Sequence, residues 1–185
     1  MKKILILFFI LPFGFSVLPV FAAEATQAGE TRESTKSASA QIIYELPYPG
    51  LLSDSPIYFI KVLRDKVVLF LTRDPIKKAE YHLLLADKRI HMAAILVDKG
   101  KVELAKETAL KGENEYTLLV FLFKDIVKKP NKDLFERLEK SALKHQEVLR
   151  SIINKVDKKD EKTFVTVLEF SERNLEELKQ IYKNY

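Results

Sequence analysis

Apolar residues recur at alternating steps of three and four positions along most of the chain beyond residue 75. The first such series is Ile76, Ala79, Leu83, Ala86, Ile90, Ala93 and Val97. This spacing predicts a helix over residues 75–99. Similar series predict three more helices, over residues 101–129, 133–156 and 161–183. Because only short turns separate them, the pattern favours an antiparallel helical bundle over a single long coiled coil.

A further helix is expected before these four, over residues 56–71. Ser55-Pro56 and Asp74-Pro75 each place a capping side chain before a proline at the first helical position. The 56–71 segment is apolar on most faces, but it is interrupted by the charged residues Lys61, Arg64, Asp65 and Lys66. These charges argue against a membrane span, so we predict a central helix buried by its neighbours. The fold class is therefore all-α, with about five helices.

Three segments precede the helices. Residues 1–22 combine Lys2 and Lys3, an uncharged apolar run and a small residue at Ala22, as in a secretory signal peptide. Cleavage after Ala22 is expected, and an uncleaved anchor is the alternative. Residues 23–41 are rich in Ala, Ser, Thr, Glu and Gln, which predicts a disordered linker.

Residues 42–50 contain two prolines that bracket a tyrosine, followed by Gly50. Prolines hold the chain extended, so we predict a strap that lies across the helices and buries Leu46 and Tyr48. The helical domain then comprises residues 42–185. It is expected in the cell envelope or outside the cell.

Composition narrows the function classes. The absence of cysteine excludes a disulfide framework and a lipid anchor on an N-terminal cysteine. A net charge of +5 is too weak to argue for nucleic-acid binding. Basic groups around residues 128–129 and 158–159 lie at helix ends, where cations are favourable. Contact with anionic lipid or an acidic cell-wall polymer is the alternative interpretation of these two groups.

Residues able to carry chemistry are few. None of His82, His91 and His145 has a glutamate three positions before it, so the di-iron bundle motif is absent. Asp87 and His91 form at most half of a metal site. His145 falls on an apolar seam, which predicts a packed, hydrogen-bonded histidine or one at the bundle edge. Because no phosphate loop or nucleotide motif is present either, we expect no catalytic site, no cofactor and no metal.

Two features of the 101–129 segment concern packing. Ala105, Ala109 and Gly112 occupy successive seam positions, which predicts the close approach of another helix or of the strap. A ligand groove is the alternative there. Residues 118–123 are apolar all round, so we expect this turn to be surrounded by helices of this chain or by a second copy. Homo-oligomerisation therefore stays open.

Residues 44–100 carry a more specific pattern, which opens with Leu-Pro-Tyr-Pro-Gly at 46–50 and continues through Asp-Ser-Pro at 54–56. This stretch resembles a bacterial exported helical family, the domain of unknown function 5667. The family-like part extends to about residue 130, and residues 131–185 would form a C-terminal helical hairpin. Ser53 stands where the family often has proline, which softens the entry to the first helix. The resemblance implies an exported helical protein and assigns no activity.

The recurring polar positions of that resemblance are interpreted as structural. They are Asp54, Arg64, Asp65, Arg73, Asp74, Asp87 and Arg89. Asp54 and Asp74 are expected to cap helices, and the others to form salt bridges between the strap and the first two helices. Arg64 or Arg89 is expected to pair with a partly buried carboxylate, and breaking that pair would cost about 3 kcal/mol.

These observations favour a non-enzymatic interaction module that holds an envelope protein or polymer. We expect it to bind no nucleic acid and to have no membrane span after signal cleavage. The alternative is a sensor-type bundle that binds a small ligand or a metal ion. A third, weaker option is an enzyme whose carboxylates are not recognisable singly. An interaction module should expose a contiguous apolar patch. A ligand binder should enclose a pocket, and an enzyme should cluster carboxylates with shifted protonation.

Overall fold

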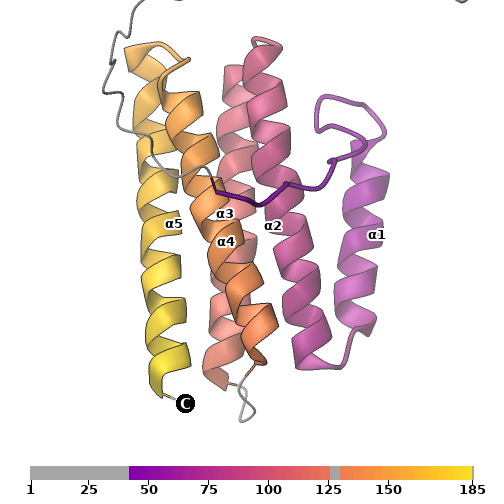
Figure 1. The fold of residues 1–185 in the computed structure, drawn as a ribbon. Coiled ribbons are helices and arrows are strands. Elements are labelled where there is room, and N and C mark those ends of the chain that lie inside the picture. Colours follow the sequence, from indigo (N-terminus) through magenta and orange to yellow (C-terminus); the bar gives the residue numbers. More distant parts are fainter. Residues whose placement is uncertain (1–41, 126–129, 185) are drawn as a thin grey trace, which may run out of the picture. The chain divides into compact units, whose positions relative to one another are not determined.

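The computed structural model describes residues 42–125 and 130–184, and the predicted signal peptide and linker lie outside these residues. Ser39–Tyr185 form one compact unit. Five helices make up the secondary structure of the described residues (Figure 1). They are α1 (Tyr58–Leu71), α2 (Pro75–Asp98), α3 (Val102–Asp125), α4 (Lys132–Ile153) and α5 (Lys158–Asn184). The predicted all-α fold of about five helices is confirmed.

The helix boundaries follow from local chemistry. Asp74 caps α2 as predicted, because its carboxylate accepts a hydrogen bond from the Lys77 N–H at 2.9 Å. Gly100 ends this helix with a φ of 71°, the left-handed conformation that favours glycine. The predicted cap at Ser55-Pro56 is wrong. Turns occupy the residues before α1, and Ser55 offers only its backbone carbonyl to the N–H of Tyr58.

Helices α2 to α5 form a four-helix bundle. The α2–α3 pair and the α4–α5 pair are antiparallel hairpins, which meet through contacts of α2 with α4 and of α3 with α5 (Figure 1). The bundle buries two apolar clusters. One includes Leu119, Phe123 and Leu138, and the other includes Ile90 and Phe164. Every fully buried apolar side chain of the described residues falls between residues 46 and 178, so Ser39–Tyr185 carries its own core.

Helices α2 and α3 approach closely at Gly112. A Cβ atom built there would lie 3.1 Å from Cδ1 of Ile90 and 3.2 Å from Cβ of Arg89. Ala105 and Ala109, on the same seam, are completely buried. The small residues therefore serve close helix packing, as predicted, and no ligand groove lies along this seam.

Helices of this chain cover only part of the apolar turn at residues 118–123 of α3. Leu119, Val120 and Phe123 are buried, but Leu118 and Phe121 are 41% and 51% exposed. Helix α3 packs against α2 and α5, and this leaves one of its sides outward. Helices of this chain therefore do not surround this turn, and its coverage by a second copy stays a prediction.

The position of α1 is the largest departure from expectation. We predicted a central, buried helix, but α1 lies alongside α2 at one edge of the bundle and contributes no buried apolar residue (Figure 1). None of the described helices has the length and hydrophobicity needed to cross a membrane.

Residues 42–50 form no helix and reach the bundle through alternate side chains. Leu46 is buried, and the ring Nδ1 of His91 lies 3.0 Å from the carbonyl oxygen of Pro47. Tyr48, which we expected to be buried, is 76% exposed. The alternation shifts after Pro47, so that Pro49 takes the inward position in place of Tyr48.

The close approach at Gly112 gives a stability prediction. Gly112→Val should lower the free energy of unfolding by about 1–3 kcal/mol, because the added carbons would overlap Ile90 and the backbone-fixed Cβ of Arg89. Denaturant unfolding measures this change. Lys111→Val is the matched control on the exposed side of the same helix and should cost well under about 1 kcal/mol. Equal effects of the two variants would refute the packing explanation.

Candidate functional site

Half of the large apolar side chains that stand exposed in the described residues lie on or immediately before α1. They are Ile57, Phe59, Ile60, Leu63, Val67, Phe70 and Leu71. At 3.6 residues per turn, the six that belong to the helix fall within roughly 120° of its circumference. We call this set the α1 apolar face. It is contiguous, and Phe70 is 85% exposed.

Polar contacts and the packing of one partly buried side chain, Tyr58, on the second apolar cluster hold α1 in place. Its one buried residue is Asp65, which accepts hydrogen bonds from the Arg64 guanidinium at 2.7 Å and from the Tyr81 hydroxyl of α2 at 3.0 Å. The Lys61 ammonium donates to the carbonyl oxygens of Pro49 and Leu51, at 2.6 and 3.1 Å. These contacts lie on the side of α1 that faces α2 and the preceding residues, so the apolar face points outward.

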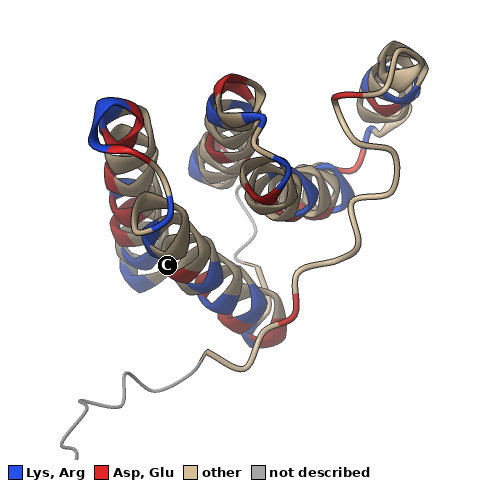
Figure 2. Ribbon diagram, turned by 90° about the horizontal axis from the view of Figure 1, so that it is seen from above, with Lys and Arg blue, Asp and Glu red and all other residues tan. Residues whose placement is uncertain are grey.

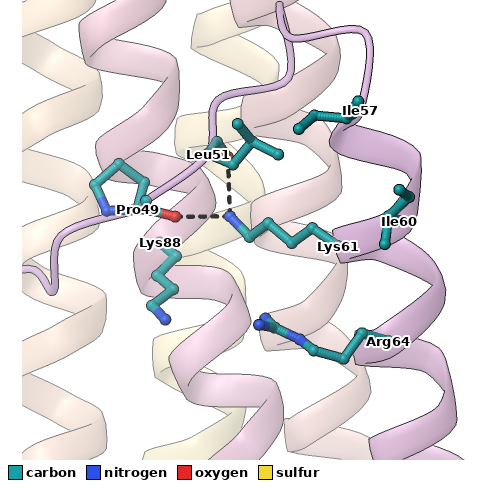
Figure 3. A pocket seen from close by; sticks show the side chains of 8 residues that line it. Pro49, Leu51, Ile57, Ile60, Lys61, Arg64 and Lys88 are labelled. Atoms are coloured by element: carbon teal, nitrogen blue, oxygen red, sulfur yellow. Dashed lines mark hydrogen bonds between the residues drawn. The ribbon is translucent and has the colours of Figure 1, made fainter. Parts of the chain in front are cut away.

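A pocket of about 370 Å³ lies between α1, α2 and residues 49–51 (Figure 3). Its lining combines Ile57, Ile60 and Leu51 with three cationic side chains and contains no acidic residue. The three cations are Lys61, Arg64 and Lys88. We call it the cationic pocket.

The charges of the cationic pocket act on one another. Burial lowers the pKa of the Lys61 ammonium, and repulsion from Lys88, Arg64 and Arg89 lowers it further, while Asp65 opposes the shift. The pocket is therefore a place where an added anion would relieve electrostatic repulsion.

A second set of polar residues lies inside the bundle. His145 of α4 is completely buried between two carboxylates. Its Nε2–H donates to Asp87 of α2 at 2.9 Å, and its Nδ1–H donates to Glu113 of α3 at 2.8 Å. Asp87 also accepts from Ser141 at 2.5 Å and from the Tyr44 hydroxyl at 2.6 Å. We call these residues the buried histidine cluster.

The buried histidine cluster keeps a proton on His145. Burial alone would lower the pKa of His145, but the charge of Glu113 and the hydrogen bonds to Asp87 and Glu113 outweigh it. The net result raises the pKa from 6.5 to about 9. At neutral pH the imidazolium therefore bridges two carboxylates and partly offsets their buried charge.

Helices α2 and α3 share another charged group near the bundle surface. The Glu115 carboxylate receives hydrogen bonds from His82, at 2.6 Å, and from Arg89. Burial would raise the pKa of Glu115, but these two donors outweigh it and lower the pKa. The side chains of Arg89 and Glu115 are 14% and 12% exposed, so the predicted pairing of Arg89 with a partly buried carboxylate is confirmed.

The structure separates the other predicted polar residues. Asp54 does not cap α1: it pairs with Lys99 and Lys101, at 3.1 and 2.8 Å, and hydrogen bonds from Lys101 and Lys99 lower its pKa. Arg73 is exposed beside the Asp74 cap.

The half metal site suggested by Asp87 and His91 does not form. Asp87 faces His145, while His91 contacts Pro47. Within residues 42–125 and 130–184, no group of three or more His, Asp or Glu side chains is arranged to hold a metal ion.

Most of the helix-end lysines in the described part of the chain have acidic partners. Lys124 pairs with Glu177 at 2.8 Å, and Lys155 pairs with Asp98 at 2.9 Å. Figure 2 shows basic and acidic residues interspersed along the helices of the bundle. Residues 128 and 129 lie outside the described part. The pairs that are described fit solvated, charge-complemented helix ends.

The family model described as "Domain of unknown function (DUF5667)" matches residues 50–159, more than half of the 185-residue chain. The chain belongs to this family. No curated protein and no solved structure matches it. The DUF5667 match extends past the resemblance over residues 44–130 and includes all of α4.

The DUF5667 segment contains the α1 apolar face, the cationic pocket apart from Pro49, and four members of the buried histidine cluster. They are Asp87, Glu113, Ser141 and His145. Tyr44, the fifth member of that cluster, precedes the match. Sequence reasoning singled out Asp87 and placed His145 on a seam, but it missed Glu113. The sequence did contain an indication that His145 has such a partner. A histidine on an apolar seam is buried in the bundle, and a buried histidine requires acidic or polar partners on the facing helices.

Solvent does not reach the imidazole of His145 in this DUF5667 protein, because His145 and Glu113 are 0% exposed and Asp87 is 2% exposed. A substrate could not contact the imidazole without opening the bundle. The arrangement therefore joins α2, α3 and α4 and also holds residue 44. The α1 apolar face and the cationic pocket are the accessible features.

The pair between Arg89 and Glu115 gives a second prediction. Arg89→Ala should lower the free energy of unfolding by about 3 kcal/mol, because it leaves a largely buried carboxylate without its cation. Arg150→Ala is the control, since the Arg150–Glu172 pair is 2.7 Å long but about half exposed, and its loss should cost less than about 1 kcal/mol. Superimposable melting curves for Arg89→Ala and the parent protein would contradict this.

The buried histidine cluster predicts how stability depends on pH. The pKa of His145 is higher in the folded protein than in the unfolded chain, so its stabilisation is complete below about 6.5 and is lost as pH rises through about 9. The loss should be on the order of 3 kcal/mol in the free energy of unfolding.

Denaturant unfolding at a series of pH values measures this loss, and an NMR titration of the imidazole in the folded protein should give a pKa of about 9. His145→Gln should be less stable at neutral pH and should lack this pH dependence between 6.5 and 9. If the parent protein were equally stable across that range, His145 would not be protonated in the folded state.

Proposed function

We propose that this DUF5667 protein is a non-enzymatic interaction module of the cell envelope, with α1 as its contact element. The α1 apolar face is the observation that supports this most directly. Soluble monomers rarely leave a large contiguous apolar patch in water, and such patches mark interaction sites. Covering even one side chain as exposed as Phe70 would contribute about 1.5–3 kcal/mol.

The framework behind α1 fits a presenting role. The four-helix bundle has its own core, and α1 adds no buried apolar side chain to it. Helix α1 is nevertheless held in a defined place by Asp65 and Lys61. Because α1 is fixed in place and its apolar side chains are not buried in the core, these side chains are available to contact a partner. The signal-peptide pattern of residues 1–22 supports a place outside the cytoplasm.

The alternative is a small-ligand- or metal-binding bundle of the sensor type. Its ligand-binding form draws support from the cationic pocket, whose 370 Å³ is near the lower end of ligand-site volumes. The pocket would select an anionic molecule with an apolar part. Because Ile57 and Ile60 belong to both features, the pocket adjoins the α1 apolar face, and the two functions would use the same surface.

Site-specific photocrosslinking in living cells of the source bacterium tests the proposal. A photoreactive amino acid at Leu63 or Phe70 should give crosslinks to an envelope component, because these side chains would lie within the contact. The same amino acid at Leu118 or Phe121, which are exposed on α3, is the matched control and should give none. Crosslinks of equal yield from both helices, or none from α1, would count against α1 as the contact element.

A further inference from the structure

The exposed charges of α1 are all basic. Arg64 and Lys66 are exposed, while Asp65, the acidic residue of this helix, is buried against Arg64 and Tyr81. Helical geometry at 100° per residue places Arg64 at one edge of the α1 apolar face and Lys66 at the other. An apolar strip edged by long basic side chains is typical of a helix that lies in a membrane interface, since their stems cover apolar surface while their charges reach the headgroups.

Each edge of α1 also adjoins a hollow lined by cations. The cationic pocket brings Lys88 of α2 beside Arg64 and Lys61. On the other edge, a hollow of about 530 Å³ is lined by Lys66 and by Lys111 of α3, next to Phe59 and Leu63. The Lys111 ammonium also pairs with Glu107 at 3.2 Å, so Lys66 supplies most of the net charge there. Neither lining includes an acidic residue. Anionic groups that meet α1 from outside would therefore find positive charge on both sides of the apolar face.

Charge also argues against a second copy of the chain as the occupant. Two copies that met through α1 would bring Arg64 and Lys66 of both into one interface, without an exposed carboxylate on either helix to oppose them. Like charges placed together in an interface disfavour association. A surface rich in negative charge complements α1 instead.

From these observations we infer that α1 docks on an anionic phospholipid bilayer. The α1 apolar face enters the boundary between headgroups and acyl chains, and the cations of the two flanking hollows bind lipid phosphates. Helix α1 has 14 residues, fewer than the roughly 20 that a spanning helix needs, so it lies along the surface. This inference rests on the proposed function and names its partner.

Vesicle flotation tests the inference. The protein used comprises residues 39–185, which form one compact unit and omit the apolar run of residues 4–18 that would bind lipid by itself. It should float with vesicles made of equal parts of phosphatidylcholine and phosphatidylglycerol. It should float poorly with phosphatidylcholine alone, and added salt should weaken binding to the mixed vesicles.

Variants assign the binding to α1. Leu63→Ser with Phe70→Ser should lower the affinity at least about tenfold, while Phe121→Ser on α3 should leave it unchanged. Lys66→Gln and Lys88→Gln should each lower it about fivefold. Lys158→Gln with Lys159→Gln removes two exposed charges from the start of α5 and should have little effect. Circular dichroism and thermal melting verify that each variant is folded.

Three outcomes would overturn the inference. They are equal binding to neutral and mixed vesicles, an unchanged affinity of the Leu63→Ser/Phe70→Ser variant, and an unchanged affinity of both Lys66→Gln and Lys88→Gln. If lipid binding fails while crosslinks from Leu63 and Phe70 reach an envelope protein, the lipid inference is wrong and the proposed function stands. If both fail, the proposed function is wrong as well.

Discussion

The charged bridge from Asp87 through His145 to Glu113 is the constraint around which the bundle is organised. Each residue comes from a different helix, and none has access to water that could solvate it. Two carboxylates in such a place would repel one another and would each lack hydration. The imidazolium satisfies one oxygen of each, and Asn174 of α5 lies 3.4 Å from the other oxygen of Glu113. All four helices of the bundle thus meet at one polar centre.

A chain of contacts runs from this centre to α1. Asp87 holds the Tyr44 hydroxyl, His91 one turn later contacts the carbonyl of Pro47, and the carbonyls of Pro49 and Leu51 bind Lys61 of α1. Residues 44–51 therefore connect the buried polar centre to α1, and their contacts at both ends help to fix the position of this surface helix. Asp65 and Tyr81 add a second attachment farther along α1. The apolar face is thereby presented at one edge of the bundle without sharing its core.

The sequence predicted those features that depend on local periodicity and local chemistry. The seam spacing located α2 to α5, Asp74 and Gly100 marked two helix ends, and Gly112 indicated a close helix pair. It failed for α1, because apolar positions on most faces are compatible both with a buried central helix and with an exposed helix at the edge of the bundle. It also failed for Glu113. A carboxylate beside a seam resembles a surface residue until the fold brings His145 opposite it, and that proximity is a property of tertiary structure alone.

The absence of buried apolar side chains on α1 has a consequence for how such a protein can diverge. Under the proposed function, substitutions on the outward side of this helix would alter what it recognises, yet they would remove nothing from the two apolar clusters of the bundle. Recognition and folding would then depend on largely separate sets of residues. Selection could then change the specificity of α1 for its partner without lowering the stability of the fold. The condition is that Lys61 and Asp65 keep α1 in place.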